Sequence, residues 1–463
     1  MSTMTTIARS DEGALREIET LMAGRCTRSA EMLRQHSHDE SWHHPGLPDI
    51  VVFPTSTEDV ARVVREASRL GLPIVAFGTG SSMEGHVNAT RGGVCIDTRD
   101  MREILEVDTI NAHCRVQAGV RRKELERHLR DTGYFFPVDP GADASLGGMA
   151  ATRASGTTTV RYGSMRENVV GLTVVLADGR IIRTGGRAKK SSSGYDLTRL
   201  FVGSEGTLGV ITELILRLSP IPEASTVFIA SFPEFRSAVE AVHELLMLSL
   251  PLARIEYLDE LEVDALNRFA GQQWTKQTTL ILETHDTAEL RDSIVEKVSD
   301  VLLGQGADVR IATTLDDQRA VWATRHRLAD AERQLRPGCH MFVTDVAVPL
   351  SALAEFIDKV RRMSQTLGIL APAVGHIGDG NLHVTLLIDR DDPEEMRQAE
   401  NFHDWIVSES LRLGGTATGE HGIGLGKRKY LVQEHGGAVE VMRAIKAALD
   451  PSNLMNPGKI FQD

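Results

Sequence analysis

Short apolar runs and amphipathic segments alternate in the first half of the chain. Residues 49–54 contain the unbroken run Ile50-Val51-Val52-Phe53, which predicts a short buried strand. Thr55 and Glu58 have the spacing of a capping box, so an amphipathic helix is expected to begin here and to end at Gly71. This segment should therefore form a strand followed by a helix.

The same alternation continues to about residue 217. Further strands are expected at residues 73–77 and 94–97. Residues 174–182 predict a hairpin, because Asp178-Gly179 is a favoured two-residue turn and lies between two apolar runs. The first half should therefore contain mostly short strands, with helices between some of them.

A domain boundary is expected at residues 217–222, because Pro220 and Pro222 interrupt regular structure. Beyond it, strand-like and helical segments alternate up to about residue 313. This alternation predicts an α+β arrangement in which a sheet is covered by helices.

Length and charge narrow the possible functions. With 463 residues, the chain is too long for one ordinary core and should divide into two or three domains. The formal net charge of −13 and the lack of a basic stripe argue against nucleic acid as a partner. We find no membrane-spanning run, signal peptide or transit sequence, so we expect a cytoplasmic protein, with peripheral contact at the inner membrane left open.

Neither the cysteines nor the histidines near the N-terminus indicate a site by their spacing. The four cysteines lie far apart and form no Cys-x-x-Cys motif, so we expect reduced thiols. The histidines between residues 36 and 44 show no regular spacing. We expect them to be solvated.

Glycine-rich segments follow several of the predicted strands. Gly78-Thr79-Gly80-Ser81-Ser82 comes directly after residues 73–77, and its amides and hydroxyls suit the oxygens of a phosphate or pyrophosphate. The segment is neither a Walker loop nor a complete Rossmann fingerprint, and a plain turn is the more frequent explanation. Residues 135–163 and 201–212 are rich in small residues, which predicts backbone that lies flat against a large planar ligand.

Two histidines and a later Glu-His pair are the strongest candidates for chemistry. If Asp379-Gly380 is a two-residue turn, His376 pairs with His383 across it, with Cβ atoms about 5 Å apart. That separation suits two imidazoles that share a divalent cation, with Glu420 as third ligand and His421 as a base. The alternative is a surface hairpin whose histidines bind nothing.

Together and in this order, these motifs resemble a known family. The segments similar to the FAD domain of the vanillyl-alcohol oxidase/p-cresol methylhydroxylase fold are Gly78 to Ser82, Pro140 to Ser145, Gly203 to Gly209 and Asn456 to Lys459. With residues 375–383 and 418–424, the chain after about residue 45 resembles the FAD-linked D-lactate dehydrogenases. Relatives of that group include D-2-hydroxyglutarate dehydrogenases and the flavin subunit of glycolate oxidase.

The resemblance implies an α+β protein with a two-part FAD-binding domain and an α+β cap domain. Residues 1–221 would form the FAD-binding domain. Residues 222–425 would form the cap, with the substrate and metal sites, and residues 426–463 would be helices that return to the FAD domain.

The resemblance also implies a role for individual residues. Those that would bind FAD are Gly78, Thr79, Gly80, Ser81, Ser82, Gly85, Pro140, Gly141, Ser145, Gly148, Gly156, Glu205, Gly209, Ile211 and Asn456. The metal ligands would be His376, His383 and Glu420. His421 would be the base, and Arg325 would bind the substrate carboxylate. Without the resemblance, Arg325 is equally well an exposed helix arginine.

Two positions depart from the family pattern. Ser81 and Ser82 stand where some members carry a histidine that tethers the flavin, so we expect non-covalent FAD. Val343 stands where the hydroxyglutarate branch has a lysine, two residues before Asp345. This difference favours a short monocarboxylate over a dicarboxylate.

The expected reaction is oxidation of a D-2-hydroxy acid, D-lactate or a similar short monocarboxylate, to the 2-oxo acid. Arg325 would hold the carboxylate, Zn²⁺ or Mn²⁺ would lower the hydroxyl pKa, His421 would take the proton, and hydride would pass to FAD. Glycolate and D-2-hydroxyglutarate stay as alternative substrates. The acceptor is open among a cytochrome, a quinone, an electron-transfer flavoprotein and oxygen, and a homodimer is compatible with the sequence.

Two other functions stay open. One is a flavin-dependent transferase like the alkyl-DHAP synthases, which share the fold but carry out no net redox reaction. The other is a catalytically silent FAD subunit of a larger complex, although the intact His, His, Glu, His set argues against it. Formation of a 2-oxo acid with reduction of a dye would separate these functions from a dehydrogenase.

Overall fold

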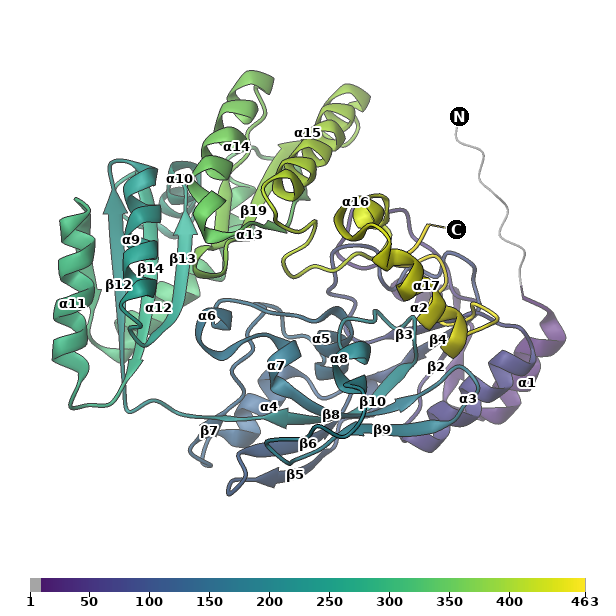
Figure 1. The fold of residues 1–463 in the computed structure, drawn as a ribbon. Coiled ribbons are helices and arrows are strands. Elements are labelled where there is room, and N and C mark those ends of the chain that lie inside the picture. Colours follow the sequence, from purple (N-terminus) through teal and green to yellow (C-terminus); the bar gives the residue numbers. More distant parts are fainter. Residues whose placement is uncertain (1–9, 463) are drawn as a thin grey trace. The chain divides into compact units, whose positions relative to one another are not determined.

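The computed structural model describes residues 10–462, which form two compact units (Figure 1). The first unit contains the chain up to Ser155, Gly163–Ile221 and the segment from Glu420 onward. The second contains Gly156–Tyr162 and Pro222–Gly419. The sequence predicted residues 156–162 in the FAD-binding domain and residues 420–425 in the cap domain. In the structure, residues 156–162 belong to the second unit and residues 420–425 to the first.

The first unit begins with a small sheet covered by helices. Its strand order is β1-β2-β4-β3, and β4 runs parallel to both β2 and β3. These strands are β1 (Cys26–Thr27), β2 (Ile50–Val52), β3 (Ile74–Phe77) and β4 (Val94–Asp97). The helices of this part are α1 (Glu12–Leu21), α2 (Ala30–Gln35) and α3 (Thr57–Arg69), followed by the 3₁₀ helix η1 (Thr98–Asp100).

Helix α3 shows how local sequence and packing agree. Its N-cap is Ser56, whose side chain accepts a hydrogen bond from the Asp59 backbone N–H, so the predicted cap at Thr55 is wrong by one residue. The apolar stripe of this helix is buried in a core that also contains residues of α1, β2, β3 and β4.

A five-stranded antiparallel sheet forms the rest of the first unit's framework, in the order β5-β6-β10-β8-β9. Its strands are β5 (Ile104–Asp108), β6 (His113–Gln117), β8 (Val169–Val175), β9 (Ile181–Gly185) and β10 (Val210–Arg217). Val175 pairs with Ile181, which confirms the hairpin predicted at residues 174–182. The predicted two-residue turn is wrong by one residue, because Leu176 lies opposite Arg180 and the loop contains residues 177–179.

Short helices and a small ribbon complete the first unit. The helices are α4 (Arg122–Leu129), α5 (Leu146–Thr152), α7 (Met165–Asn168), α8 (Leu197–Phe201), η4 (Arg428–Tyr430), α16 (Leu431–His435) and α17 (Ala438–Leu449). The ribbon pairs β7 (Tyr134–Phe135) with β11 (Ser219–Pro220). Side chains of α5, β6, β8 and β10 share one apolar core.

One histidine of the first unit contradicts the expectation of solvated side chains near the N-terminus. His36 is 1% exposed. Its Nε2 lies 2.8 Å from Asp97 Oδ2, and its Nδ1 lies 2.7 Å from the Met32 carbonyl oxygen. The prediction was wrong because Asp97, the partner of this ring, is 61 residues away in the sequence.

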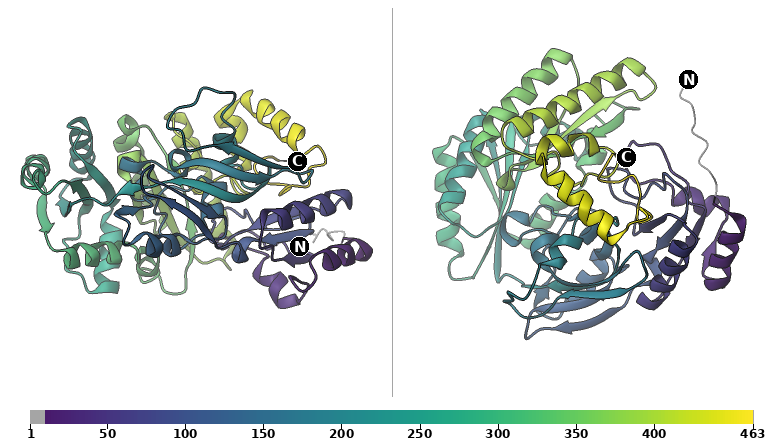
Figure 2. Two further views of the ribbon diagram at one scale, coloured as in Figure 1. Left: turned by 90° about the horizontal axis from the view of Figure 1, so that it is seen from below. Right: turned by 45° about the vertical axis from the view of Figure 1, so that its right-hand side comes forward.

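The second unit is one large sheet with helices on both faces (Figure 1 and Figure 2). The strand order is β15-β12-β14-β13-β18-β19-β16, and β17 also pairs with β19. The strands are β12 (Ala224–Phe232), β13 (Leu252–Leu258), β14 (Thr278–Asp286), β15 (Asp308–Ala312), β16 (His340–Val343), β17 (Val346–Ala347), β18 (Ala373–His376) and β19 (Asn381–Ile388).

Helices alternate with these strands, as the sequence predicted for residues 226–313. They are α6 (Thr159–Tyr162), α9 (Phe235–Met247), α10 (Glu260–Ala270), α11 (Arg291–Gly304), α12 (Leu315–Arg325), α13 (Leu328–Glu332), η2 (Leu350–Ala352), α14 (Leu353–Leu367), η3 (Ile377–Asp379) and α15 (Pro393–Arg412). Apolar residues of α10, α12 and α13 pack on one sheet face. No helix within residues 10–462 is long and apolar enough to cross a membrane.

Candidate functional site

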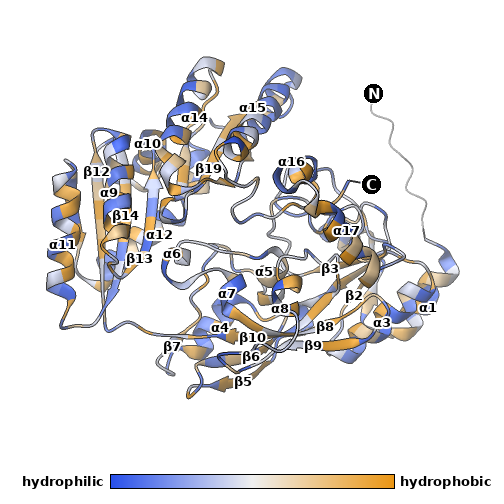
Figure 3. Ribbon diagram, viewed as in Figure 1, coloured by the Kyte–Doolittle hydropathy of each residue, from blue (hydrophilic) through white to orange (hydrophobic). Residues whose placement is uncertain are grey.

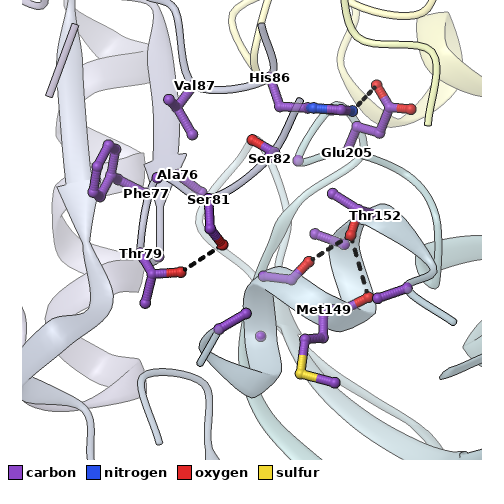
Figure 4. A pocket seen from close by; sticks show the side chains of 18 of the residues that line it. Ala76, Phe77, Thr79, Ser81, Ser82, His86, Val87, Met149, Thr152 and Glu205 are labelled. Atoms are coloured by element: carbon purple, nitrogen blue, oxygen red, sulfur yellow. Dashed lines mark hydrogen bonds and ion pairs between the residues drawn. The ribbon is translucent and has the colours of Figure 1, made fainter. Parts of the chain in front are cut away.

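A cavity in the first unit collects most of the residues that were predicted to bind FAD (Figure 4). It is lined by the loop after β3, by the segment around α5 and by the turn before β10. The predicted residues in its lining are Gly78, Thr79, Gly80, Ser81, Ser82, Pro140, Gly148, Glu205, Gly209, Ile211 and Asn456. Three segments that are distant in the sequence therefore meet at one cavity.

The loop after β3 requires glycine for steric reasons. A Cβ added to Gly78 would lie 2.2 Å from Ser145 Oγ, so no larger residue fits without a shift of the loop. The Thr79 and Ser81 hydroxyls lie 3.1 Å apart beside the cavity, as Figure 4 shows. Backbone amides and hydroxyls in a tight loop fit the phosphate oxygens of a dinucleotide.

Ser145 lines a second, polar cavity, which shares Phe77, Gly78, Thr79 and Thr98 with the first. Its hydroxyl is buried and has no hydrogen-bond partner among residues 10–462. A buried polar atom of this kind normally has a partner, so the orphaned hydroxyl fits a bound phosphate or ribose oxygen. This observation supports FAD beside the loop.

Three of the predicted FAD residues lie outside both cavities. A Cβ at Gly85 would meet Leu425 and His43, so this glycine serves packing within the first unit. Gly141 has a φ of +80° and turns the chain after Pro140. Gly156 belongs to the second unit.

Glu205 lines the cavity and also has a structural role within the first unit. It is buried, and its carboxylate accepts hydrogen bonds from the backbone N–H groups of Ile423 and Gly424, at 2.7 and 2.8 Å. Burial opposes ionisation of Glu205, but the nearby His86 and these two amides outweigh it and lower its pKa. Glu205 therefore anchors the segment that follows His421.

His86 is a residue of this cavity that the sequence analysis missed. Its Nε2 lies 3.3 Å from Glu205 Oε2, the ion pair marked in Figure 4. Burial lowers the pKa of His86, but the charges of Glu205 and Asp39 outweigh this effect and raise it. The cavity is thus bordered by one buried charged pair.

Glu420 and His421 line the same cavity of the first unit. Ser155 Oγ donates a hydrogen bond to Glu420 Oε2 at 2.8 Å, which orients this carboxylate. The predicted base and the predicted third ligand are therefore both at the cavity that the FAD residues line.

His376 and His383 lie together in the second unit, with ring centroids 5.6 Å apart. The predicted two-residue turn is wrong, because Val374, not His376, is the partner of His383. Residues 377–380 form a longer connection that contains η3 and a left-handed Gly380. The register differs by two residues, which returns side chains to the same face, so the two rings still meet.

Glu256 on β13 contacts the Nδ1 atom of His376. It lies opposite His376 in the sheet, is fully buried, and its Oε1 is 2.6 Å from His376 Nδ1. Arg325, at the end of α12, donates from Nε and Nη2 to the other oxygen, Oε2, at 3.0 and 2.6 Å. Burial opposes ionisation of Glu256, but His376 and Arg325 outweigh it and lower its pKa.

His383 is oriented in a similar way by its own surroundings. Its Nδ1 lies 3.4 Å from the Thr344 carbonyl oxygen and 3.7 Å from Asp345 Oδ1. Asp345 is itself buried and accepts hydrogen bonds from Asn381 and Thr418. Metal-binding histidines commonly turn one ring nitrogen to a carbonyl or carboxylate oxygen in this way, so both rings fit a cation bound through Nε2.

Comparison with known proteins places this chain in a family. Residues 221–460 match the model of the C-terminal domain of FAD linked oxidases, and residues 48–185 match that of an FAD binding domain. A probable mitochondrial D-lactate dehydrogenase of Danio rerio is 45% identical, with 92% of this chain and 87% of that protein covered.

The chain belongs to the FAD-linked oxidase family. A mitochondrial D-lactate dehydrogenase [cytochrome] of Arabidopsis thaliana is also similar to this FAD-linked oxidase, at 38% identity over 96% of this chain and 79% of that protein. The structure of p-cresol methylhydroxylase with substrate bound matches with a TM-score of 0.80 and 19% identity, covering 98% of each chain.

These findings confirm three predictions for this FAD-linked oxidase. Its fold is the two-part FAD-binding fold of the vanillyl-alcohol oxidase type with a cap domain. Its cofactor is FAD, and it is an oxidoreductase. The roles predicted for individual side chains stay predictions.

The sequence analysis also missed Glu256, although a signal was present. Residues 252–258 read Leu-Ala-Arg-Ile-Glu-Tyr-Leu, an apolar strand with two charges at alternate positions. Charges at this spacing share one sheet face, and Figure 3 shows the hydrophilic residues of β13. A charged residue in a buried strand indicates a buried partner.

Proposed function

We propose that this FAD-linked oxidase oxidises D-lactate, or a similar short D-2-hydroxy monocarboxylate, to the 2-oxo acid. The observation that carries the proposal is the 45% identity to a probable D-lactate dehydrogenase over 92% of the chain. Val343, on β16, supports a monocarboxylate, because no lysine stands at this position to meet a second carboxylate. Bound FAD supplies the acceptor for the two electrons removed from the substrate.

The proposal includes a divalent cation, Zn²⁺ or Mn²⁺, bound by His376, His383 and Glu420. Two buried imidazoles with centroids 5.6 Å apart, each with Nδ1 near an oxygen acceptor, support it. Nitrogen and carboxylate ligands suit both metals. The cation, when bound, would lower the pKa of the substrate hydroxyl.

His421 is proposed as the base that takes the hydroxyl proton of the substrate. The side chain lines the FAD cavity, and the segment that follows it is anchored by Glu205. Arg325 is proposed to bind the substrate carboxylate, and its side chain is 13% exposed. A positioned base contributes roughly 10²–10⁴-fold to a rate.

We also propose that FAD binds without a covalent link, because serines occupy the loop position at which some relatives carry a histidine. Ser82 Oγ donates to Asp39 at 2.9 Å, and Ser81 contacts Thr79. Acid precipitation of the purified protein should therefore release all of the flavin into the supernatant. Flavin that stays with the precipitate would contradict this part of the proposal.

The test of the reaction is anaerobic mixing of the FAD-loaded protein with D-lactate or L-lactate, followed through the visible absorption of oxidised flavin. D-Lactate alone should bleach the band. Prior treatment with a chelator should prevent bleaching, and added Mn²⁺ or Zn²⁺ should restore it. Flavin that no short 2-hydroxy acid reduces would contradict the proposed reaction, and bleaching unaffected by the chelator would contradict the metal alone.

For the electron acceptor we propose a cytochrome, because the Arabidopsis relative carries that designation in its name. Steady-state reduction of cytochrome c with D-lactate should therefore occur without an added dye. Turnover with a quinone analogue but none with cytochrome c would contradict this choice.

A further inference from the structure

A buried glutamate joins the histidine of the proposed metal site to the arginine of the proposed carboxylate site. Glu256 is fully buried, and its two oxygens are divided between His376 and Arg325. Arg325 approaches through two nitrogens, Nε and Nη2, at 3.0 and 2.6 Å from the same oxygen. One carboxylate therefore sets the position of two side chains from different elements.

The same sheet face carries a second bridge of this kind, one strand away. Glu283 on β14 has Oε1 at 2.9 Å from His285 Nε2 and Oε2 at 3.1 Å from Arg254 Nη1. Arg254 lies opposite Glu283 in the sheet and two residues from Glu256 on β13. This second bridge, however, holds a histidine that is not part of the predicted metal set.

We propose that Glu256 is a positioning residue that prepares His376 for the cation and Arg325 for the substrate carboxylate. The inference rests on the proposed function and extends it to a residue that does not touch substrate. Because His376 Nδ1 lies 2.6 Å from Glu256 Oε1, this nitrogen is the one that donates to the glutamate, and Nε2 is the nitrogen that would ligate the cation. Glu256 thus selects the tautomer of the ligand.

The charge of Glu256 also bears on substrate choice. Arg325 forms an ion pair with Glu256 Oε2, so the Glu256 carboxylate neutralises part of its charge. With two of its nitrogens held by Glu256, Arg325 offers its remaining edge to a substrate carboxylate. This arrangement suits a substrate with a single carboxylate, bound by Arg325 and also by the proposed metal ion. It is a second reason to expect a monocarboxylate substrate.

The test replaces Glu256 with glutamine. The amide has nearly the same shape, but its NH₂ group would face a donor on either His376 or Arg325. Metal affinity is measured by chelator competition with Mn²⁺ on the FAD-loaded, metal-stripped protein. We expect Glu256→Gln to weaken Mn²⁺ binding 10–100-fold, as is typical for the partner of a metal ligand. At saturating Mn²⁺, KM for D-lactate should rise while the flavin content stays at the wild-type level.

Glu283→Gln is the matched control, because it removes another buried Glu, 8% exposed against 0% for Glu256, that lies between an Arg and a His on the same face. The free energy of unfolding of Glu283→Gln should fall about as much as that of Glu256→Gln, but its Mn²⁺ affinity and its KM for D-lactate should stay at the wild-type values. Glu256→Asp keeps the charge but cannot reach both partners, so it should have a Mn²⁺ affinity between those of the wild type and Glu256→Gln. If the glutamine variant does not fold, the aspartate variant is used for the test instead.

Each outcome discriminates. Wild-type Mn²⁺ affinity and KM in Glu256→Gln, or in Glu256→Asp if only that variant folds, would overturn the role of Glu256. An equal loss of affinity in Glu283→Gln would overturn it too, because the effect would then come from the sheet as a whole. A wild-type protein that binds no Mn²⁺ or Zn²⁺ would instead refute the metal in the proposed function.

Discussion

The two units carry contrasting kinds of site. The cavity of the first unit is lined largely by glycine, alanine, serine and threonine, which present backbone and small hydroxyls to a ligand. The site residues of the second unit are buried charged side chains that project from regular strands, such as Glu256 and His376. Small side chains in the first unit leave room for a large cofactor, whereas the proposed cation site of the second unit consists of buried polar and charged side chains.

The contrast has a consequence for stability and function. Buried charges are tolerated only when partners are in place, so the second unit depends on complete pairs. The cavity of the first unit depends on the absence of bulk, so it should be sensitive to any added methyl group. Loss of metal and loss of FAD should therefore be separable by mutation.

The largest expected effect is at His421. His421→Ala removes the proposed base, so kcat for D-lactate should fall roughly 10²–10⁴-fold. FAD should stay bound, because the glycine-rich loop after β3 and the segment around α5, which line most of the cavity, are untouched. Stopped-flow flavin reduction together with the flavin-to-protein ratio measures both quantities. Full activity in this variant would rule out His421 as the base.

A large effect is also expected at His383. His383→Ala removes a proposed ligand, so Mn²⁺ affinity should fall by more than the roughly 10–100-fold seen for an outer partner. The FAD content should not change, because the flavin cavity is built from residues of the first unit. Isothermal titration of the FAD-loaded variant with Mn²⁺ measures this loss of metal affinity. Unchanged affinity would remove His383 from the ligand set.

A substitution at Gly78 should weaken FAD binding and leave metal binding unchanged, the opposite of the effect expected at His383. Gly78→Ala places a methyl group against Ser145 Oγ, at 2.2 Å without relaxation. Overpacking of this kind typically costs about 1–3 kcal/mol, so FAD should bind roughly 5–150-fold more weakly. Mn²⁺ affinity should be unaffected. Fluorescence titration of the apoprotein with FAD tests this, and wild-type affinity would show that the loop can shift at no cost.

The smallest expected effect is at Glu409, a largely buried residue of α15 whose partners Lys359 and Arg412 are exposed. Hydrogen bonds from Arg412 and Lys359 lower its pKa to about 2, despite partial burial. The folded-state pKa lies below the ordinary value, so the stabilisation is present above the ordinary pKa and is lost as pH falls through about 2. Glu409→Gln should therefore cost at most about 1 kcal/mol at neutral pH and nothing below pH 2. Urea unfolding of the wild type and the variant at neutral pH and below pH 2 measures the two free energies of unfolding. An equal loss at both pH values would contradict the role of the ionised carboxylate.

Local pattern was enough to predict much of this molecule. The β8–β9 hairpin was predicted because Asp178-Gly179 is a local turn signal between two apolar runs. The glycine-rich loop at Gly78 was found because loops that approach a ligand closely need glycine whatever surrounds them. Such features depend on residues that are near one another in the chain.

Only the tertiary structure decided the pairing of charges. The hairpin before His383 was expected to be tight, but residues 377–380 form a longer connection, and β18 pairs with both β13 and β19. Glu256 contacts His376 across 120 residues and Arg325 across 69, and His36 contacts Asp97 across 61. These contacts arise from strand order and helix packing, which bring together residues whose sequence separation carries no signal. The sequence by itself thus determined most of the elements and the small-residue loops, while long-range packing determined which buried charges are neighbours.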